Sequence, residues 1–258
     1  AEAEAGFAHS LFVKLNGTLW GTGSNTTGLL GIDQSTPRLF PAQLQAGVVA
    51  VESGVTHGFF LKADATLWAS GQNESGQLGD GTTTHRSVPV QTAAGVAAVA
   101  VGYSHSLFLK QDGTLWAAGR NDSGQLAAGL LVNRSVPIHV AEGVMAIAAG
   151  SSHSLFLKME GTLWAAGAND FGQLGDGTTT SRSIPAQVAS GVAAIAAGSS
   201  HSLFLKTDGT LWSLGANHSG QLGDGTTIDR HTPVRVADYA IAIAAGSEHS
   251  LFVQKSEG

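Results

Sequence analysis

The segment AAGSSHSLFLK occupies residues 148–158 and returns unchanged at residues 196–206. Weaker copies occur four more times along the chain, and the histidine in each keeps the same 48-residue interval. The six histidines are His9, His57, His105, His153, His201 and His249. Five tryptophans keep this interval too. A fixed interval that no insertion interrupts is typical of a repeat protein, in which each unit is one supersecondary motif.

Each repeat holds four short strand patterns. In the last repeat, the small and β-branched residues of 191–198 precede HSLFLK (201–206), and an Asp-Gly turn leads into TLWSLG (210–215). A loop rich in Gly, Asn and Thr (216–232) follows, and then PVRVA (233–237), which begins with proline as an edge strand permits. Four antiparallel strands in about 40–50 residues predict a propeller blade. We therefore expect an all-β, five-bladed β-propeller of four-stranded antiparallel blades.

The composition excludes several classes of function. Of the 258 residues, 43% are hydrophobic and only 12% are charged, with a net charge of −6. This acidic balance argues against a nucleic-acid partner. The absence of cysteine excludes disulfides, zinc thiolate sites and cysteine nucleophiles. No apolar run approaches the ~18 residues of a membrane span, so we expect no membrane partner.

The repeat resembles the sequence motif of a known family. The string G-x-x-H-S-L-F-L-K-x-D-G-T-L-W-A-A-G-x-N-x-x-G-Q-L-G-D-G resembles the repeat of the regulator of chromosome condensation family over the whole chain after residue 5. The resemblance implies a propeller of four-stranded blades. Because that family includes a nucleotide exchange factor for a small GTPase, ubiquitin-ligase modules, a plant light receptor and bacterial enzyme inhibitors, it leaves the function open.

The sequence departs from this family in two respects. Members usually have seven blades, whereas this chain has material for five. The exchange factor of the family also carries an inserted β-wedge, for which the uninterrupted register leaves no room. Nucleotide exchange on a small GTPase is therefore the least favoured of the functions considered.

The long third-to-fourth loops and the first-to-second turns are expected on one face. Binding residues concentrate on such loops, and we predict a scaffold that binds a protein or glycan through this face. Positions that differ between blades are the candidate ligand residues, because identical positions more often serve the blade itself. They are Glu74, His85, Tyr103, Arg120, Asp122, Asp170, Phe171, His218, Asp229 and His231.

Residues that recur in every blade are interpreted as structural. We expect each histidine to bond the backbone of a neighbouring loop, each arginine to bond carbonyls or an aspartate of an adjacent loop, and the Asp of Gly-Asp-Gly to cap a turn. A ligand or metal role for the histidines, a cationic ring of arginines and a calcium site are the alternatives, although we predict neither a metal nor a cofactor. The set comprises His57, His105, His153, His201, Trp68, Trp116, Trp164, Trp212, Arg86, Arg134, Arg182 and Arg230.

Catalysis is the main alternative to binding. A carbohydrate-active hydrolase or lyase would work at the centre of the loop face, where paired carboxylates such as Asp170 and Asp176 could act as general acid and base. Such an enzyme would lose activity when one acid that is not repeated is replaced. No recognised catalytic constellation stands out among the repeated serines and histidines.

The ends of the chain raise two further expectations. Residues 1–5, AEAEA, match nothing in the repeats, so we interpret them as a remnant of cloning or secretion processing and place the propeller in residues 6–258. If the protein is secreted, six Asn-x-Ser/Thr sequences would be acceptor sites for N-linked glycans. They begin at Asn16, Asn25, Asn73, Asn121, Asn133 and Asn217.

The sixth copy of the histidine segment bears on closure of the ring. Five repeats close if residues 240–246 supply the inner strand of the first blade. The strands at His9 and His249 then compete for one place, and the displaced copy pairs elsewhere. A strand-swapped oligomer is the partner that this surplus strand predicts.

Overall fold

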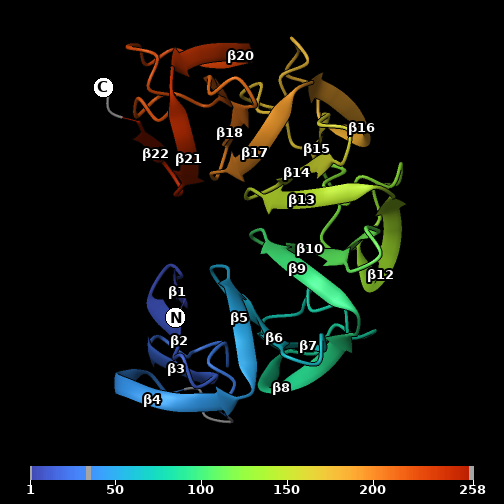
Figure 1. The fold of residues 1–258 in the computed structure, drawn as a ribbon. Helices are drawn as coiled ribbons and strands as arrows, with labels where there is room; N and C mark the ends of the chain where they lie inside the picture. Colours follow the sequence, from blue (N-terminus) through green and yellow to red (C-terminus); the bar gives the residue numbers. More distant parts are fainter. Residues whose placement is uncertain (1, 33–35, 256–258) are drawn as a thin grey trace. The chain divides into compact units, whose positions relative to one another are not determined.

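The computed structural model describes residues 2–32 and 36–255, and the part described contains β-strands and no helix. Consecutive strands form five four-stranded sheets and one two-stranded sheet, which we call blades 1 to 6 in chain order (Figure 1). Blade 1 contains β1 (Glu2–Ala5), β2 (His9–Val13), β3 (Thr18–Gly23) and β4 (Arg38–Ala46), and blade 2 contains β5 (Val48–Ser53), β6 (His57–Lys62), β7 (Leu67–Gly71) and β8 (Arg86–Ala93). Blade 3 contains β9 (Val96–Val101), β10 (His105–Lys110), β11 (Leu115–Gly119) and β12 (Arg134–Ala141), and blade 4 contains β13 (Val144–Ala149), β14 (His153–Lys158), β15 (Leu163–Gly167) and β16 (Arg182–Ala189). Blade 5 contains β17 (Val192–Ala197), β18 (His201–Lys206), β19 (Leu211–Gly215) and β20 (Arg230–Ala237), and blade 6 contains β21 (Ala240–Ala245) and β22 (Ser250–Gln254).

Pairing within a blade follows the repeat closely. In blade 5, Phe204 lies opposite Trp212 across the antiparallel β18–β19 pair, and their rings stack with centroids 6.2 Å apart. Gly215 ends β19 with φ +103°, and a Cβ there would lie 2.6 Å from the carbonyl oxygen of Ser200. The recurring glycine after the Trp strand is therefore required both by its left-handed conformation and by this close backbone approach.

The chain divides into two compact units. Unit 1 comprises Ala1–Asp112, Trp116–Arg120 and Asn133–Ile138, and unit 2 comprises Gly113–Leu115, Asn121–Val132 and His139–Gly258. In both units the apolar core lies between successive blades. In unit 2, Leu155 and Leu174 of blade 4 pack in one buried cluster with Phe204 of blade 5.

The core of unit 1 has the same construction. Leu11 and Leu19 of blade 1 cluster with Phe60 of blade 2. Phe59 of blade 2 meets Phe108 of blade 3 edge to face, with centroids 5.5 Å apart. Since each blade buries its apolar side chains against its neighbour, contacts between blades carry much of the hydrophobic stabilisation.

The first residues differ from the sequence-based expectation. Glu2–Ala5 form β1, which pairs antiparallel with β2 from Ala5↔Ser10 to Glu2↔Val13 and so occupies the first-strand position of blade 1. We had placed residues 1–5 outside the fold because AEAEA matches nothing in the repeats. The open edge of β2 accounts for the difference, because its backbone groups can be satisfied by any extended segment. Residue 1 lies outside the described residues.

The predicted closure by residues 240–246 is wrong in this structure. β21 pairs with β22 in a separate two-stranded sheet, and the first-strand position of blade 1 is filled by β1. The copies at His9 and His249 therefore do not compete, since each is the second strand of its own blade. The sixth copy of the segment begins a partial sixth blade.

Candidate functional site

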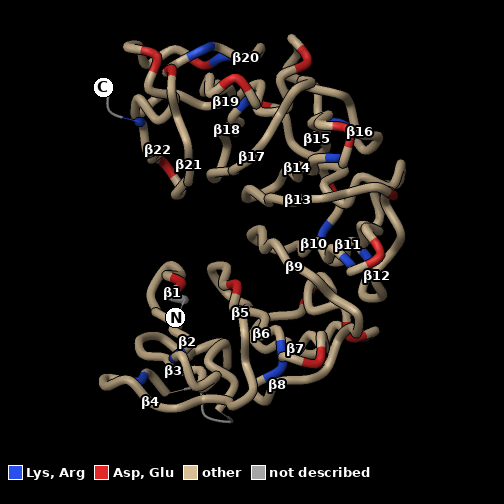
Figure 2. Tube along the Cα trace, viewed as in Figure 1, with Lys and Arg blue, Asp and Glu red and all other residues tan. Residues whose placement is uncertain are grey.

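The antiparallel order places two connections at the same edge of each four-stranded blade. These are the turn between the first and second strands and the long loop between the third and fourth strands. We call this the loop edge. Along both units, acidic and basic positions are interspersed (Figure 2).

A buried asparagine organises the long loop at this edge. In blade 4 the side-chain amide of Asn169 donates to Asp176 Oδ1 (3.1 Å) and to the carbonyls of Thr178 (3.0 Å) and Thr180 (3.2 Å). Its carbonyl oxygen accepts from the backbone N–H of Leu174 (2.9 Å). Asn73 and Asn217 make the corresponding bonds in blades 2 and 5. The loop is thus a fixed platform rather than a flexible connection.

This arrangement bears on the predicted glycosylation sites. Asn73, Asn121 and Asn217 are 0% exposed and Asn25 is 1% exposed, so their amides are inaccessible in the folded chain. Asn16 and Asn133 are exposed. Four of the six sequences are therefore structural asparagines of the repeat, and their resemblance to acceptor sites follows from the small polar residues of the turn.

The recurring arginine and aspartate form an ion pair within one loop. Arg86 pairs with Asp80, Arg182 with Asp176 and Arg230 with Asp224. We had expected carbonyls or an aspartate of an adjacent loop, but the partner lies six residues earlier in the same loop. The aspartate also caps a turn, as predicted for the Asp of Gly-Asp-Gly. Its carboxylate accepts a hydrogen bond from the backbone N–H two residues later, as Asp80 does from Thr82.

This ion pair bears on the proposed acid–base carboxylates. Burial raises the pKa of Asp176, but hydrogen bonds from Thr178 and the pairing with Arg182 outweigh it and lower the pKa to about 2. A carboxyl group that is ionised at neutral pH and bonded through both oxygens is unsuited to donate a proton. Asp170 is exposed at the loop edge.

The recurring histidines join neighbouring blades. His57 Nε2 lies 3.0 Å from Ser106 Oγ of the next blade, and that hydroxyl donates to the carbonyl oxygen of Gln77 (2.8 Å). The hydroxyl oxygen is thereby left to accept from Nε2–H. His153 and His201 make the same bond, to Ser202 and Ser250. The expected partner was loop backbone; the observed one is a serine 49 residues later in the sequence.

Blade 1 departs from this pattern in an informative way. Gly58 stands where other blades have the serine, and His9 Nε2 instead lies 2.5 Å from Ser53 Oγ, a side chain on the neighbouring strand β5. A hydroxyl acceptor is thus retained even where the repeat changes.

Burial keeps these histidines neutral, and this predicts a pH-dependent stability. Burial lowers the pKa of His57 to about 3, and burial together with His249 lowers that of His201 to about 4. Their ordinary pKa is 6.5, so the unfolded chain binds more protons below that value. Stability is therefore full above pH 6.5 and falls between pH 6.5 and about 4, approaching ~1.4 kcal/mol per pH unit for each buried histidine.

Urea denaturation between pH 7 and pH 5 measures this effect. Replacing the buried His57 by glutamine should reduce the pH slope, because one imidazole that the folded chain keeps neutral is removed. A free energy of unfolding that stays constant from pH 7 to pH 5 would contradict the role given to the buried imidazoles.

Among the candidate ligand residues of unit 1, Glu74 and His85 lie together. His85 Nε2 lies 3.5 Å from Glu74 Oε1, and His85 Nδ1 accepts from the backbone N–H of Asn73 (3.0 Å). Tyr103 and Arg120 are exposed.

A second group forms in unit 2, at the loop edges of blades 4 and 5. Phe171 meets His218 edge to face with centroids 5.5 Å apart, and His218 Nε2 lies 3.6 Å from Asp229 Oδ2. Asp229 also accepts from the backbone N–H of Asn217 (2.8 Å). His231 packs beneath Gly172. The structure thus brings Phe171, His218 and Asp229 together, and Asp122 is exposed at the loop edge of blade 3.

An exposed aliphatic run lies in the long loop of blade 3. Leu130, Leu131 and Val132 are 48%, 60% and 59% exposed. Asn121 Nδ2 donates to the carbonyls of Leu130 (2.6 Å) and Val132 (3.3 Å), so the exposed run has an anchored backbone. The candidate ligand residues chosen from the sequence include none of the three, although three consecutive aliphatic residues in an otherwise polar loop could have revealed the run.

The described residues contain neither a metal-binding cluster nor a membrane-spanning helix. In residues 2–32 and 36–255, no group of three His, Asp or Glu side chains could hold a metal ion. Within the same ranges, no helix is long and apolar enough to cross a membrane.

Four-stranded antiparallel blades that repeat every 48 residues and join through their core and loop edges define a repeat β-propeller protein. The chain belongs to the RCC1-like domain family, whose model matches residues 1–258. This agrees with the resemblance noted in the repeat motif.

Solved structures show the same fold. The crystal structure of human WBSCR16 matches with a TM-score of 0.87 and 25% identity, covering 98% of this chain and 71% of that one. A chain in the structure of Kap60 bound to yeast RCC1 (Prp20) matches with a TM-score of 0.85 and 23% identity, covering 98% and 67%. Prp20p from Saccharomyces cerevisiae, described with its binding to Gsp1p and histones, matches with a TM-score of 0.72 and 22% identity, covering 99% and 82%. A comparison with curated proteins gave no match.

Proposed function

We propose that the chain is a protein-binding scaffold whose partner contacts the loop edges. The observation that carries this proposal is the exposed run Leu130–Val132, held by Asn121 on a fixed backbone. Adjacent exposed aliphatic side chains are costly in water and are typical of surfaces that another protein covers. A rigid backbone lowers the entropy cost of binding, because the loop is ordered before the partner arrives.

The charge of the chain indicates what kind of protein partner it would favour. The net charge is −6, and the loop arginines of blades 2, 4 and 5 are neutralised by their aspartates. A partner with a basic surface is therefore favoured electrostatically. Prp20p, which shares the fold, has been studied for binding to Gsp1p and to histones. A purified core histone dimer and Gsp1p are accordingly the two probes we choose.

Replacing Leu130, Leu131 and Val132 together by serine should weaken binding of the histone probe at least tenfold, because the apolar contact is lost. Isothermal titration calorimetry of the wild-type chain and the variant measures the change. The matched control replaces Val88, Val136 and Ile184, three exposed aliphatic residues of the fourth strands, by serine and should leave the affinity unchanged.

Three outcomes separate the alternatives. Stronger binding to Gsp1p than to the histone would keep the scaffold but overturn the preference for a basic partner. Equal loss in the loop variant and in the control would overturn the loop edge as the binding surface. Failure of both probes to bind at micromolar concentration would count against the scaffold proposal itself.

A further inference from the structure

Two departures from the repeat meet at the junction between blades 4 and 5. Just before the loop glycine, blade 4 has Phe171 where the other four-stranded blades have serine or threonine. Just after the loop arginine, blade 5 has His231 where blades 2, 3 and 4 have serine. A Cβ on Gly172 would lie 2.4 Å from the Cα of His231, so the two departures are neighbours in space. Since identical positions serve every blade alike, departures that converge indicate a role specific to this junction.

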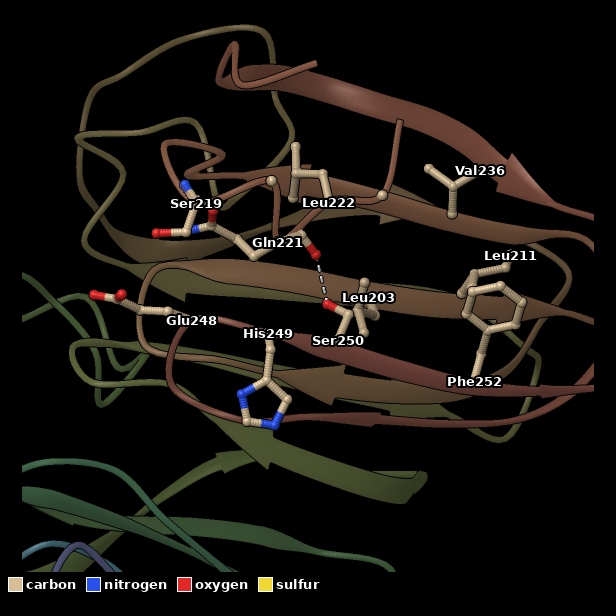
Figure 3. Close-up of a pocket in the computed structure, with 12 residues that line it drawn as sticks. Leu203, Leu211, Ser219, Gln221, Leu222, Val236, Glu248, His249, Ser250 and Phe252 are labelled. Atoms are coloured by element: carbon tan, nitrogen blue, oxygen red, sulfur yellow. Dashed lines mark hydrogen bonds between the residues drawn. The ribbon is translucent and has the colours of Figure 1, made fainter. Parts of the chain in front are cut away.

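The aromatic residue of this junction stands on an ordered backbone. Phe171 N–H donates to Gln173 Oε1 (3.0 Å), and the carbonyl oxygen of Gln173 accepts from Ser202 Oγ of blade 5 (2.9 Å). The same bond joins blades 5 and 6, where Ser250 Oγ donates to the carbonyl oxygen of Gln221 (2.7 Å; Figure 3). Phe171 is half-buried, so part of its ring is open to solvent while its backbone is fixed.

Two polar side chains of blade 5 lie beside this ring. The imidazole of His218 is 64% exposed and meets Phe171 edge to face with centroids 5.5 Å apart. Asp229 Oδ1 accepts from the backbone N–H of Asn217 (2.8 Å), which anchors the carboxylate. Asp229 Oδ2 lies 3.6 Å from His218 Nε2, beyond hydrogen-bonding distance, and no residue in the described part of the chain donates a hydrogen bond to it. One oxygen of an anchored carboxylate is thus left to accept from a ligand.

We propose that Phe171, His218 and Asp229 bind an arginine side chain of the partner, and we call these three residues the arginine subsite. The inference rests on the proposed function, because it assigns one contact of the basic partner. A guanidinium is planar and carries five N–H donors, so it stacks on an aromatic ring while it donates to a carboxylate. A lysine ammonium reaches the carboxylate but has no plane to lie on the ring. The exposed Asp170, next to Phe171 in the chain, adds to the attraction.

The arginine subsite complements the aliphatic run of blade 3. Leu130–Val132 and the subsite both belong to unit 2, and both lie at loop edges. A partner that covers the loop edges of this unit gains an apolar contact at blade 3 and a charged contact at blades 4 and 5. The apolar contact supplies affinity, and the charged contact selects a partner that has an arginine at the required place.

A small probe tests the subsite without any partner protein. Acetyl-arginine amide is titrated into the full chain, isotope-labelled at histidine and phenylalanine, and the ring signals of His218 and Phe171 are followed by NMR. Acetyl-citrulline amide has nearly the same shape without the charge and serves as the matched ligand. The arginine probe should shift both signals to saturation, and the citrulline probe should bind at least tenfold more weakly, because the charge-assisted hydrogen bond to Asp229 is lost.

Variants locate the binding within the junction. Asp229→Asn keeps an acceptor for Asn217 N–H but removes the charge, and should weaken binding of the arginine probe at least tenfold. Phe171→Ser restores the residue found in neighbouring blades, so the fold is retained, and should weaken binding about fivefold, read from the His218 signal. Asp122→Asn removes one charge from the loop edge of blade 3 and is the charge-matched control, which should leave the affinity unchanged.

The outcomes separate this inference from the scaffold proposal. Equal binding of the two probes, no shift of either ring signal, or equal losses in Asp229→Asn and Asp122→Asn would overturn the arginine subsite. Unchanged affinity of Asp229→Asn for the histone probe would rule out the subsite as a partner contact while the scaffold stands. Binding of the arginine probe by a chain that binds neither histone nor Gsp1p would instead count against the scaffold and keep the subsite.

Discussion

Replacing Gly172 by alanine should destabilise the chain by roughly 3–5 kcal/mol, whereas the same change at Gly220 should cost only about 1–2 kcal/mol. The two glycines have φ values of +79° and +75°, so the conformational cost of alanine is nearly the same. They differ in surroundings, since a Cβ on Gly172 would lie 2.4 Å from the Cα of His231 and a Cβ on Gly220 would meet nothing. Their difference therefore isolates the contact between blades 4 and 5.

Chemical denaturation of the two variants under matched conditions measures this difference. Both variants are measured at the same protein concentration, temperature and pH. Equal losses of stability would mean that blade contacts at the loop edge contribute little.

Replacing Asn169 by alanine should cost about 3–5 kcal/mol, at ~1 kcal/mol or more for each buried partner left unsatisfied. Its amide is 0% exposed and bonds Asp176, two backbone carbonyls and the N–H of Leu174. The control is Asn16→Ala, which removes only exposed bonds to Thr18 and should cost less than about 1 kcal/mol.

The free energy of unfolding from urea titration measures both changes. Circular dichroism of the Asn169 variant should retain the strand spectrum at low denaturant, since the four other four-stranded blades each keep a buried asparagine in this loop. A loss at Asn169 no larger than that at Asn16 would contradict its role as the organising residue of the loop.

The blade could be predicted from the sequence because its information is local and repeated. The spacing of Trp212, the Asp-Gly turn before it and Pro233 places each strand without knowledge of the neighbours. The second strand of blade 6 was visible in the sequence as the sixth copy at His249, although we had placed it in competition with the copy at His9. The way the ends pair was not, because residues 2–5 have weak strand propensity and are ordered by the open edge of β2.

Contacts between blades were harder to predict because they join residues about one repeat apart. The bond from His57 to Ser106 spans 49 residues, and in a repetitive sequence many serines lie at a suitable distance. The open surface beside Gly220 has no sequence signature, since Gly220 and Gly172 sit in equivalent motifs and differ only in what lies against them. The candidate ligand residues were chosen by variation alone, and the structure groups only a few of them.

The most direct test of the scaffold proposal is hydrogen–deuterium exchange of the chain with and without its histone or Gsp1p probe. Protection on binding should concentrate in the loop-edge peptide that contains Leu130–Val132 and should leave the fourth-strand peptide of Arg86–Ala93 unchanged. Protection confined to the fourth strands, with none at residues 130–132, would contradict the claim that the loop edges bind the partner.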